Sequence, residues 1–290
     1  MDLRAILMGL SFALMWSSAF TSARIIVQAA PPMTSLALRF LVSGIVGIAI
    51  AYAMGQRIKL TRPQWTATFV FGICQNALYL GMFFYAMQTI EASLASIIAA
   101  TMPLIVALLS WITGNRPRPL GIVGLFVGFF GVAVIMGARL TGNVDSLGLI
   151  LCVIGVTALS VATLSVKGAS GGGNLLMVVG LQMMVGAAVL AVPAVLFETW
   201  TVDWSWTLII AFIYTTMVPG LLATFIWFQL VQRIGAIKAA TFHFLNPFFG
   251  VAVAAVILGE ALGLTDVVGV VVITLGILAV QLSKQKPTQS

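Results

Sequence analysis

The stretch GAIKAATFHFLNPFFGVAVAAVILGE, residues 235–260, is apolar enough to cross a membrane, yet it carries His243, Asn246 and Pro247 near its middle. Proline cannot donate a helical hydrogen bond, and an unpaired carbonyl in hydrocarbon costs several kcal/mol. A lipid-facing helix would avoid this combination. The stretch therefore predicts a transmembrane helix whose polar side faces protein or a wet pathway.

A second copy of this pattern lies about 144 residues earlier, as EASLASIIAATMPLIVALLSW at residues 91–111. The alanines and proline of this copy, Ala92, Ala95 and Pro103, fall opposite Ala236, Ala239 and Pro247. A weaker echo matches Gly124 and Gly131 with Gly269 and Gly276. The chain is therefore predicted to be a duplication.

Composition restricts the chain to one broad class. It has 290 residues, of which 61% are hydrophobic and only 7% are charged, and its mean hydropathy is +1.15. A soluble domain carries roughly a quarter charged residues. The few charged residues of this chain cannot cover a water-exposed surface, so we predict a polytopic membrane protein.

The 14 basic residues outnumber the 7 acidic ones, but they lie in short clusters between apolar runs. Membrane topology explains such clusters better than nucleic-acid binding does. Cys74 and Cys152 lie inside apolar runs and predict neither a disulfide nor, with a single histidine, a structural zinc site. We expect no cofactor and no metal.

Ten apolar runs have the roughly 20 residues needed to cross about 30 Å of hydrocarbon. We interpret the first, which begins in MDLRAILMGLSFALMWSSAF, as a transmembrane helix rather than a signal peptide. The ten runs are about 5–28, 34–54, 64–87, 92–112, 119–137, 146–166, 174–196, 205–230, 236–258 and 265–283.

Charge orients these runs. With the N-terminus inside and ten alternating helices, eleven of the fourteen Lys and Arg residues fall on the inner side, Lys238 among them. Most acidic residues, including Glu198 and Glu260, fall outside. Lys and Arg concentrate in cytoplasmic loops, so we expect both termini in the cytoplasm.

Five helices per half is an odd number, so the second half must enter the membrane from the opposite side. We predict an all-α fold of ten transmembrane helices, arranged as two inverted five-helix repeats around a central cavity, with the repeats at 1–140 and 141–290. Inverted repeats are typical of alternating-access transporters.

Over essentially residues 5–283, the chain resembles the drug/metabolite transporter superfamily, in particular its EamA-like branch of ten-helix exporters. The likeness is carried by Trp16-Ser17, by the Ala-rich runs that lead to Pro103 and Pro247, by Gly259-Glu260, and by Gly269 with Gly276. The resemblance implies two five-helix bundles and the export of small metabolites through the bacterial inner membrane.

Within that branch the chain is similar to bacterial amino-acid exporters, including the aromatic amino-acid exporter. One departure is clear. The first-half counterpart of Gly259-Glu260 reads Gly114-Asn115-Arg116, so the carboxylate is not duplicated.

Several polar side chains are candidates for lining the cavity. His243 and Asn246 are three residues apart and share a helix face; they either line the cavity or bond neighbouring helices. Asn76, Tyr79 and Phe83 follow i, i+3, i+7 spacing with Gln75 beside them, and they either face the pathway or join helices.

The first helix adds Trp16 and Ser17 to these candidates, and the eighth adds Tyr214. For Ser17 and Tyr214, helix packing is the alternative role. Three prolines are predicted to act as structural hinges where each interrupts its helix: Pro103, Pro219 and Pro247.

Arg39 lies about five residues inside the second run, and we expect it to extend its charge to the outer interface, with anion contact as the alternative. The tryptophans are expected to form interfacial belts. They are Trp65, Trp111, Trp200, Trp204, Trp206 and Trp227.

Amides, imidazole and hydroxyls can bind both a carboxylate and an ammonium group, and aromatic rings accept an ammonium or another ring. Neutral or aromatic amino acids are thus the expected substrates, with drugs or other metabolites as the alternative. A lipid-modifying membrane enzyme would need clustered ionisable groups, which are scarce here, and a receptor would need a signalling module. Facilitated diffusion and proton coupling through His243 both stay open, as does the oligomeric state.

Overall fold

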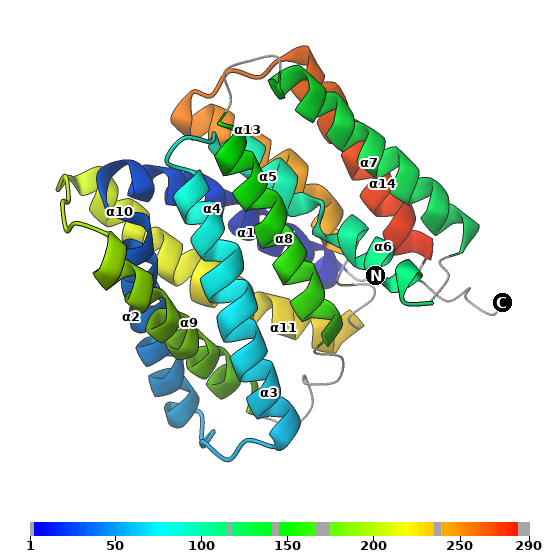
Figure 1. Cartoon of the computed structure of the whole chain (residues 1–290). Helices are drawn as coiled ribbons and strands as arrows, with labels where there is room; N and C mark the ends of the chain where they lie inside the picture. Colours follow the sequence, from blue (N-terminus) through cyan, green and yellow to red (C-terminus); the bar gives the residue numbers. More distant parts are fainter. Residues whose placement is uncertain are drawn as a thin grey trace. The chain divides into compact units, whose positions relative to one another are not determined.

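The computed structural model describes residues 3–114, 118–140, 145–165, 174–234, 239 and 241–283, which form ten helical spans (Figure 1). Some features singled out in the sequence lie outside the described residues. They are the start of the quoted stretch, Gly235 to Lys238, together with Asn115 and Arg116.

The first five spans are α1 (Leu3–Ala29), α2 (Pro32–Ala53), α3–η1–α4 (Arg62–Val70, Phe71–Tyr79, Leu80–Ala86), α5–α6 (Ala92–Ala100, Met102–Ile112) and α7 (Pro119–Leu140). The second five are α8 (Ser146–Ser165), α9 (Leu175–Phe197), α10–η2–α11 (Trp206–Thr215, Thr216–Leu222, Ala223–Ile234), η3–α13 (Thr241–Leu245, Asn246–Leu258) and α14 (Leu264–Ser283). Here η1 and η2 are π-helical and η3 is a 3₁₀ turn.

These spans confirm the all-α prediction and its ten apolar runs. Eight helices are long and apolar enough to cross a membrane, and two shorter apolar helices cover 119–135 and 242–258 among the described residues. Large apolar side chains stay exposed on the outer faces, such as Val256 at 85% and Phe126 at 69%. Exposed apolar surface of this extent suits contact with lipid.

The helix ends follow local chemistry. Pro31 is extended and Pro32 opens α2, where its missing N–H has no helical partner to lose. Ser205 caps α10 by accepting the Leu208 amide at 3.1 Å. Gly259 ends α13 with a φ of +68°, a left-handed conformation that glycine adopts without steric cost.

Two compact units make up the structure, and each draws on both halves of the sequence. The first unit takes its described residues from within 1–21, 89–146 and 223–290, and the second takes them from within 22–88 and 147–222.

Close backbone contact joins α7 and α14 in the first unit, where they run side by side (Figure 1). A Cβ atom on Gly124 would lie 2.7 Å from the Gly276 carbonyl oxygen, and one on Gly131 would lie 2.9 Å from the Ile273 nitrogen. Only glycine permits this approach. The pairing 124 with 276 and 131 with 273 makes the two helices antiparallel.

The second unit repeats this design in α2 and α9. A Cβ on Gly180 would lie 2.9 Å from the Ile48 nitrogen, and one on Gly44 would lie 2.7 Å from the Met184 sulfur. Residue numbers that increase along α2 pair with residue numbers that decrease along α9, so these two helices are also antiparallel. Helices that occupy equal places in the two halves therefore run antiparallel, as inverted repeats require.

Candidate functional site

Interruptions occur at matching places in the two halves of the chain. The third span contains the π-helical segment η1, and the eighth contains η2 around Pro219. The fourth span breaks at Thr101 before Pro103, and the ninth changes from η3 to α13 just before Pro247. All three predicted hinge prolines thus lie at helix breaks, and such breaks are frequent at functional sites of membrane transporters.

In the first unit, two aromatic rings flank the His243 ring. The Phe12 ring lies 5.3 Å away, centroid to centroid, in a T-shaped contact, and the Trp227 ring lies 5.0 Å away. The Asn246 amide nitrogen is 3.0 Å from His243 Nδ1. An amide nitrogen only donates, so Nδ1 accepts and the neutral ring carries its proton on Nε2.

Phe12 also connects this group to Trp16, with ring centroids 5.6 Å apart. We call Phe12, Trp16, Trp227, His243 and Asn246 the aromatic–histidine cluster. Trp227, which the sequence assigned to an interfacial belt, packs its ring on Phe12 at 4.7 Å and on His243. Periodicity along one helix cannot reveal a contact among α1, α11 and η3.

Polar atoms without partners lie on α1, α5 and α13 of the same unit. Ser17 Oγ, Thr21 Oγ1, Ser93 Oγ and Asn246 Oδ1 are buried and have no hydrogen-bond partner among the described residues. Ser17 and Ser96 both approach Gly250, where an added Cβ would lie 2.5 Å from Ser96 Cβ. Buried polar groups are almost always satisfied in folded proteins, so these atoms call for water or a ligand.

A buried arginine marks the break at η2 in the second unit. Arg39 Nε donates to the Thr215 carbonyl at 3.2 Å, the carbonyl that Pro219, without an N–H, cannot satisfy. Ser43 Oγ donates to the Thr216 carbonyl at 3.4 Å. The expectation that Arg39 extends to the interface was wrong, since its side chain is 6% exposed and bonded to the backbone.

The predicted face of the third span also lies in the second unit. Asn76 donates its amide to the Gln182 carbonyl at 3.0 Å, and the Tyr79 and Phe83 rings lie 4.7 Å apart. All three are buried, whereas Gln75 is half-buried. The hydrogen bond to Gln182 joins η1 to α9, the role that the sequence left as the alternative for Asn76.

Tyr214, the remaining candidate, is half-buried on α10 beside Thr215. The structure thus brings His243, Asn246 and Trp16 into one cluster, and in the other unit it places Asn76 and Tyr79 on η1 and Phe83 on the following α4. Whether any of them contacts substrate stays a prediction.

Two glutamates hold helix N-termini. Glu198 accepts the Met33 and Thr34 amides and the Thr34 hydroxyl, each at 2.7 Å. Glu260 accepts the Ala92 and Ser93 amides at 2.8 and 2.9 Å. A carboxylate at this position satisfies free N–H groups and complements the helix dipole. The capping role of Glu198 was not predicted, because no local motif links it to residues so distant in sequence.

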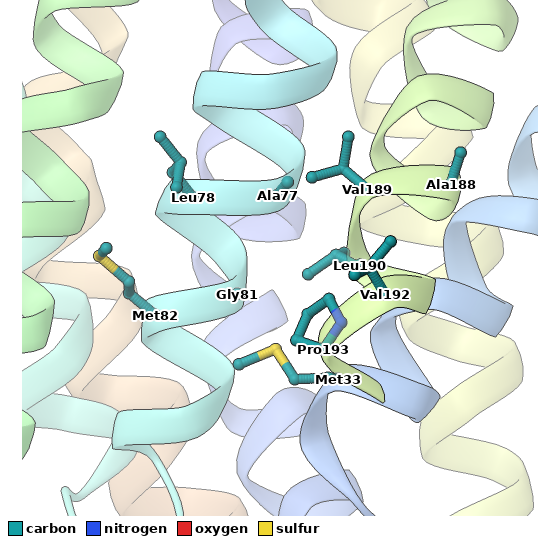
Figure 2. A pocket seen from close by; sticks show the side chains of 10 residues that line it. All are labelled: Met33, Ala77, Leu78, Gly81, Met82, Ala188, Val189, Leu190, Val192 and Pro193. Atoms are coloured by element: carbon teal, nitrogen blue, oxygen red, sulfur yellow. The ribbon is translucent and has the colours of Figure 1, made fainter. Parts of the chain in front are cut away.

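Figure 2 shows a pocket of about 580 Å³ in the second unit. It lies between η1–α4 and α9, with Met33 of α2 at one end, and apolar side chains such as Leu78, Val189 and Val192 surround it. Leu78, Val189 and Val192 are themselves exposed. An open, apolar pocket of this kind suits a lipid chain, and it offers no group that could recognise a polar substrate.

Apolar spans that are interrupted at matching places in two halves, with polar side chains nearby, are typical of multi-pass membrane transporters. The chain belongs to the EamA-like transporter family, whose profile matches it twice, at residues 3–137 and 146–282. It is a transporter of the drug/metabolite superfamily and not an enzyme, and its transport activity implies a small-molecule substrate.

The relatives give the same class. The uncharacterized inner membrane transporter YedA of Escherichia coli K12 is 28% identical over 96% of this chain and 91% of its own length. The uncharacterized transporter YvbV of Bacillus subtilis is 23% identical over 92% and 88%. The aromatic amino acid exporter YddG of Ancylobacter novellus is 33% identical, over 48% of each chain. A solved crystal structure at 21% identity, with a TM-score of 0.69 over 96% of both chains, shares the fold.

Proposed function

We propose that this transporter exports neutral amino acids, aromatic ones foremost, by alternating access between its two inverted repeats. The observation that carries the proposal is the aromatic–histidine cluster of the first unit, in which Phe12 and Trp227 flank His243. Such rings accept an aromatic side chain or an ammonium group.

The chemistry around that cluster suits a zwitterion with an apolar body. Asn246 Oδ1 is an unpaired acceptor for an ammonium group, and the hydroxyl of Ser17, which follows Trp16 on α1, can donate to a carboxylate or accept from an ammonium. No fixed countercharge is needed for either end of a neutral amino acid. The partial likeness to the aromatic amino acid exporter YddG supports the same substrate class.

A competition panel tests this proposal. The purified chain, with labelled L-phenylalanine bound, is challenged with unlabelled tryptophan, tyrosine and leucine, and with the hydrophobic cation tetraphenylphosphonium. Displacement by the amino acids and not by the cation is expected. Displacement by the cation alone would replace amino-acid export with the drug-transport alternative.

The membrane location and orientation are part of the proposal. We place the chain in the bacterial inner membrane with both termini cytoplasmic, because eleven of fourteen basic residues then face the cytoplasm and YedA is an inner membrane transporter. A fluorescent protein fused after Ser290 should therefore fluoresce in the bacterial cytoplasm. An alkaline phosphatase fusion at Ser290 that is active would contradict the orientation.

A further inference from the structure

The second unit contains another pocket, of about 370 Å³, in addition to the apolar pocket of Figure 2. Its walls are residues 27–32, where α1 passes into α2, then Tyr85 and Gln88 at the end of α4, and side chains between Phe197 and Asp203. Carboxylates, amides and hydroxyls supply many of the groups that line it. We call it the polar pocket.

The apolar and polar pockets follow each other along the same two helices. On α4, Gly81 and Met82 line the apolar pocket, and Tyr85, one turn farther along, lines the polar pocket. On α9, Pro193 and Phe197 divide between the two pockets in the same way. One helical turn rises about 5.4 Å, so the two pockets adjoin end to end within this unit.

Met33 stands at the junction of the two pockets. Its side chain lies at one end of the apolar pocket, beside Pro193 (Figure 2). Its amide donates at 2.7 Å to Glu198, which lines the polar pocket. Glu198 also accepts the amide and hydroxyl of Thr34. Both oxygens of Glu198 are therefore occupied in holding the junction together.

The apolar pocket runs inward from an interfacial level. Trp200, Trp204 and Trp206 are exposed in the connection that follows α9, and exposed tryptophans favour the membrane–water interface. Val189, in the apolar pocket, precedes Phe197 by eight residues, which is about 12 Å of helix. The hydrocarbon core is about 30 Å thick. The apolar pocket thus suits an acyl chain of one leaflet, with the polar pocket at the level of the headgroups.

The polar pocket has the charge to receive a cation. Glu198 and Asp203 are the charged residues that line it, and both are acidic. Glu198 is used at the start of α2, whereas the exposed Asp203 carboxylate bonds no group in the described part of the chain. The Asp203 amide donates to the Ala29 carbonyl at 2.8 Å, which holds this segment against the wall formed by residues 27–32. Asp203 is therefore the available partner for a cationic group.

We propose that the two pockets together bind one phospholipid whose headgroup ends in a primary ammonium, as in phosphatidylethanolamine. An acyl chain occupies the apolar pocket, and the ammonium group donates to Asp203. Gln28, Thr199 and Thr201 line the polar pocket and carry N–H and O–H donors for the phosphate. Lipid chains in the bilayer are as apolar as the walls of the apolar pocket, so the headgroup determines which lipid binds.

Native mass spectrometry of the purified full-length chain tests the inference with phospholipids that share palmitoyl and oleoyl chains. Their headgroups are ethanolamine, choline and glycerol. The ethanolamine lipid should bind about threefold tighter or more, because choline has no N–H donor and the glycerol lipid is an anion. Equal affinity for all of them would overturn the inference. Glycerophosphoethanolamine, which has the headgroup without chains, should compete poorly; competition equal to that of the lipid would show a site for a soluble amine instead.

Variants at Asp203 test the headgroup contact. Asp203→Asn should abolish the preference for the ethanolamine lipid over the choline lipid, and Asp203→Glu, which keeps the charge, should retain it. The Tm in lipid-free detergent and size-exclusion profiles monitor folding. An unchanged preference in folded Asp203→Asn would overturn the assignment of Asp203.

Variants on α9 test the position of the acyl chain. Val189→Trp places a large side chain in the apolar pocket, so it should weaken binding of all these lipids. Val195→Trp is the matched control, because Val195 is exposed on the same helix and does not line the pocket. Wild-type lipid binding by folded Val189→Trp would contradict the inference. Because lipid binding is measured without transport, the outcome does not depend on the identity of the transported substrate.

Discussion

His243 is a polar residue that the surrounding apolar side chains hold in one orientation. Phe12 and Trp227 contact its ring, and Asn246 occupies Nδ1, so only Nε2 remains to meet another group. Asn246 Oδ1, which is buried and unpaired, is a second atom that is free to bind a substrate. At this scale, the proposed function requires that the aromatic–histidine cluster bind substrate rather than only pack.

His243→Phe separates those two roles. Phenylalanine keeps the ring contacts with Phe12 and Trp227 but cannot hydrogen-bond, so the chain should fold while its kcat/KM for L-phenylalanine export falls about tenfold or more. Flux in proteoliposomes measures this. Phe248→Leu is the control, because Phe248 is exposed on α13. Wild-type flux in both His243→Phe and Asn246→Ala would reject the cluster as a substrate site.

Glu198 illustrates a residue with a structural role only. Glu198→Ala leaves the Met33 and Thr34 amides without their acceptor, so the free energy of unfolding should drop by about 1–2 kcal/mol and the Tm should fall. Asp203→Ala is the comparison, since Asp203 is exposed and its backbone amide, not its side chain, bonds the Ala29 carbonyl at 2.8 Å. An unchanged Tm in Glu198→Ala would show that water replaces the carboxylate at no cost.

At the scale of elements, the glycine crossings determine how closely helices approach. Gly124→Val would push a side chain into the Gly276 carbonyl, so we expect a loss of about 1–3 kcal/mol. Gly137→Ala on the same helix meets no atom within 4 Å and should be neutral or slightly stabilising. Chemical denaturation in detergent compares the two variants. Equal stability would mean that α7 and α14 are held together by other contacts.

The sequence predicted the elements well because proline, glycine and charge mark their ends directly. Pro32, Pro119 and Gly259 each stand where a helix starts or stops. The echo of Gly124 and Gly131 in Gly269 and Gly276 was visible in the sequence, but the sequence did not show that Gly124 lies against Gly276. The π-helical segments η1 and η2 left no periodic signal, because one widened turn does not disturb an apolar run.

Site residues were predictable only along single helices. Spacing grouped His243 with Asn246 and Asn76 with Tyr79, and the structure keeps both groups. Phe12 and Trp227 were missed because their contacts join distant helices. For Arg39, sequence position predicted the depth along α2 but not which side of the helix the residue occupies, and that side brings Arg39 to the Thr215 carbonyl rather than to the interface.

At the scale of the whole molecule, the duplication and the compact units divide the chain differently. The first unit combines α5, α6 and α7 with α13 and α14, and the second combines α2, α3 and α4 with α8 and α9. Two closely packed helix pairs, α7 with α14 and α2 with α9, therefore each take one helix from each repeat.

Separate repeats should not fold alone. A chain of residues 1–140 lacks α9 and α14, so it should be degraded or aggregate when expressed by itself. Expression together with residues 141–290 should restore a monodisperse complex in size-exclusion chromatography. A stable, monodisperse 1–140 fragment would contradict the interleaved architecture.

The most direct test of the central claim is the flux of labelled L-phenylalanine in proteoliposomes that contain the full chain. Export of an aromatic amino acid predicts flux well above that of empty liposomes, saturable and competed by unlabelled tryptophan. Flux equal to that of empty liposomes, with the chain folded in the membrane, would contradict the account.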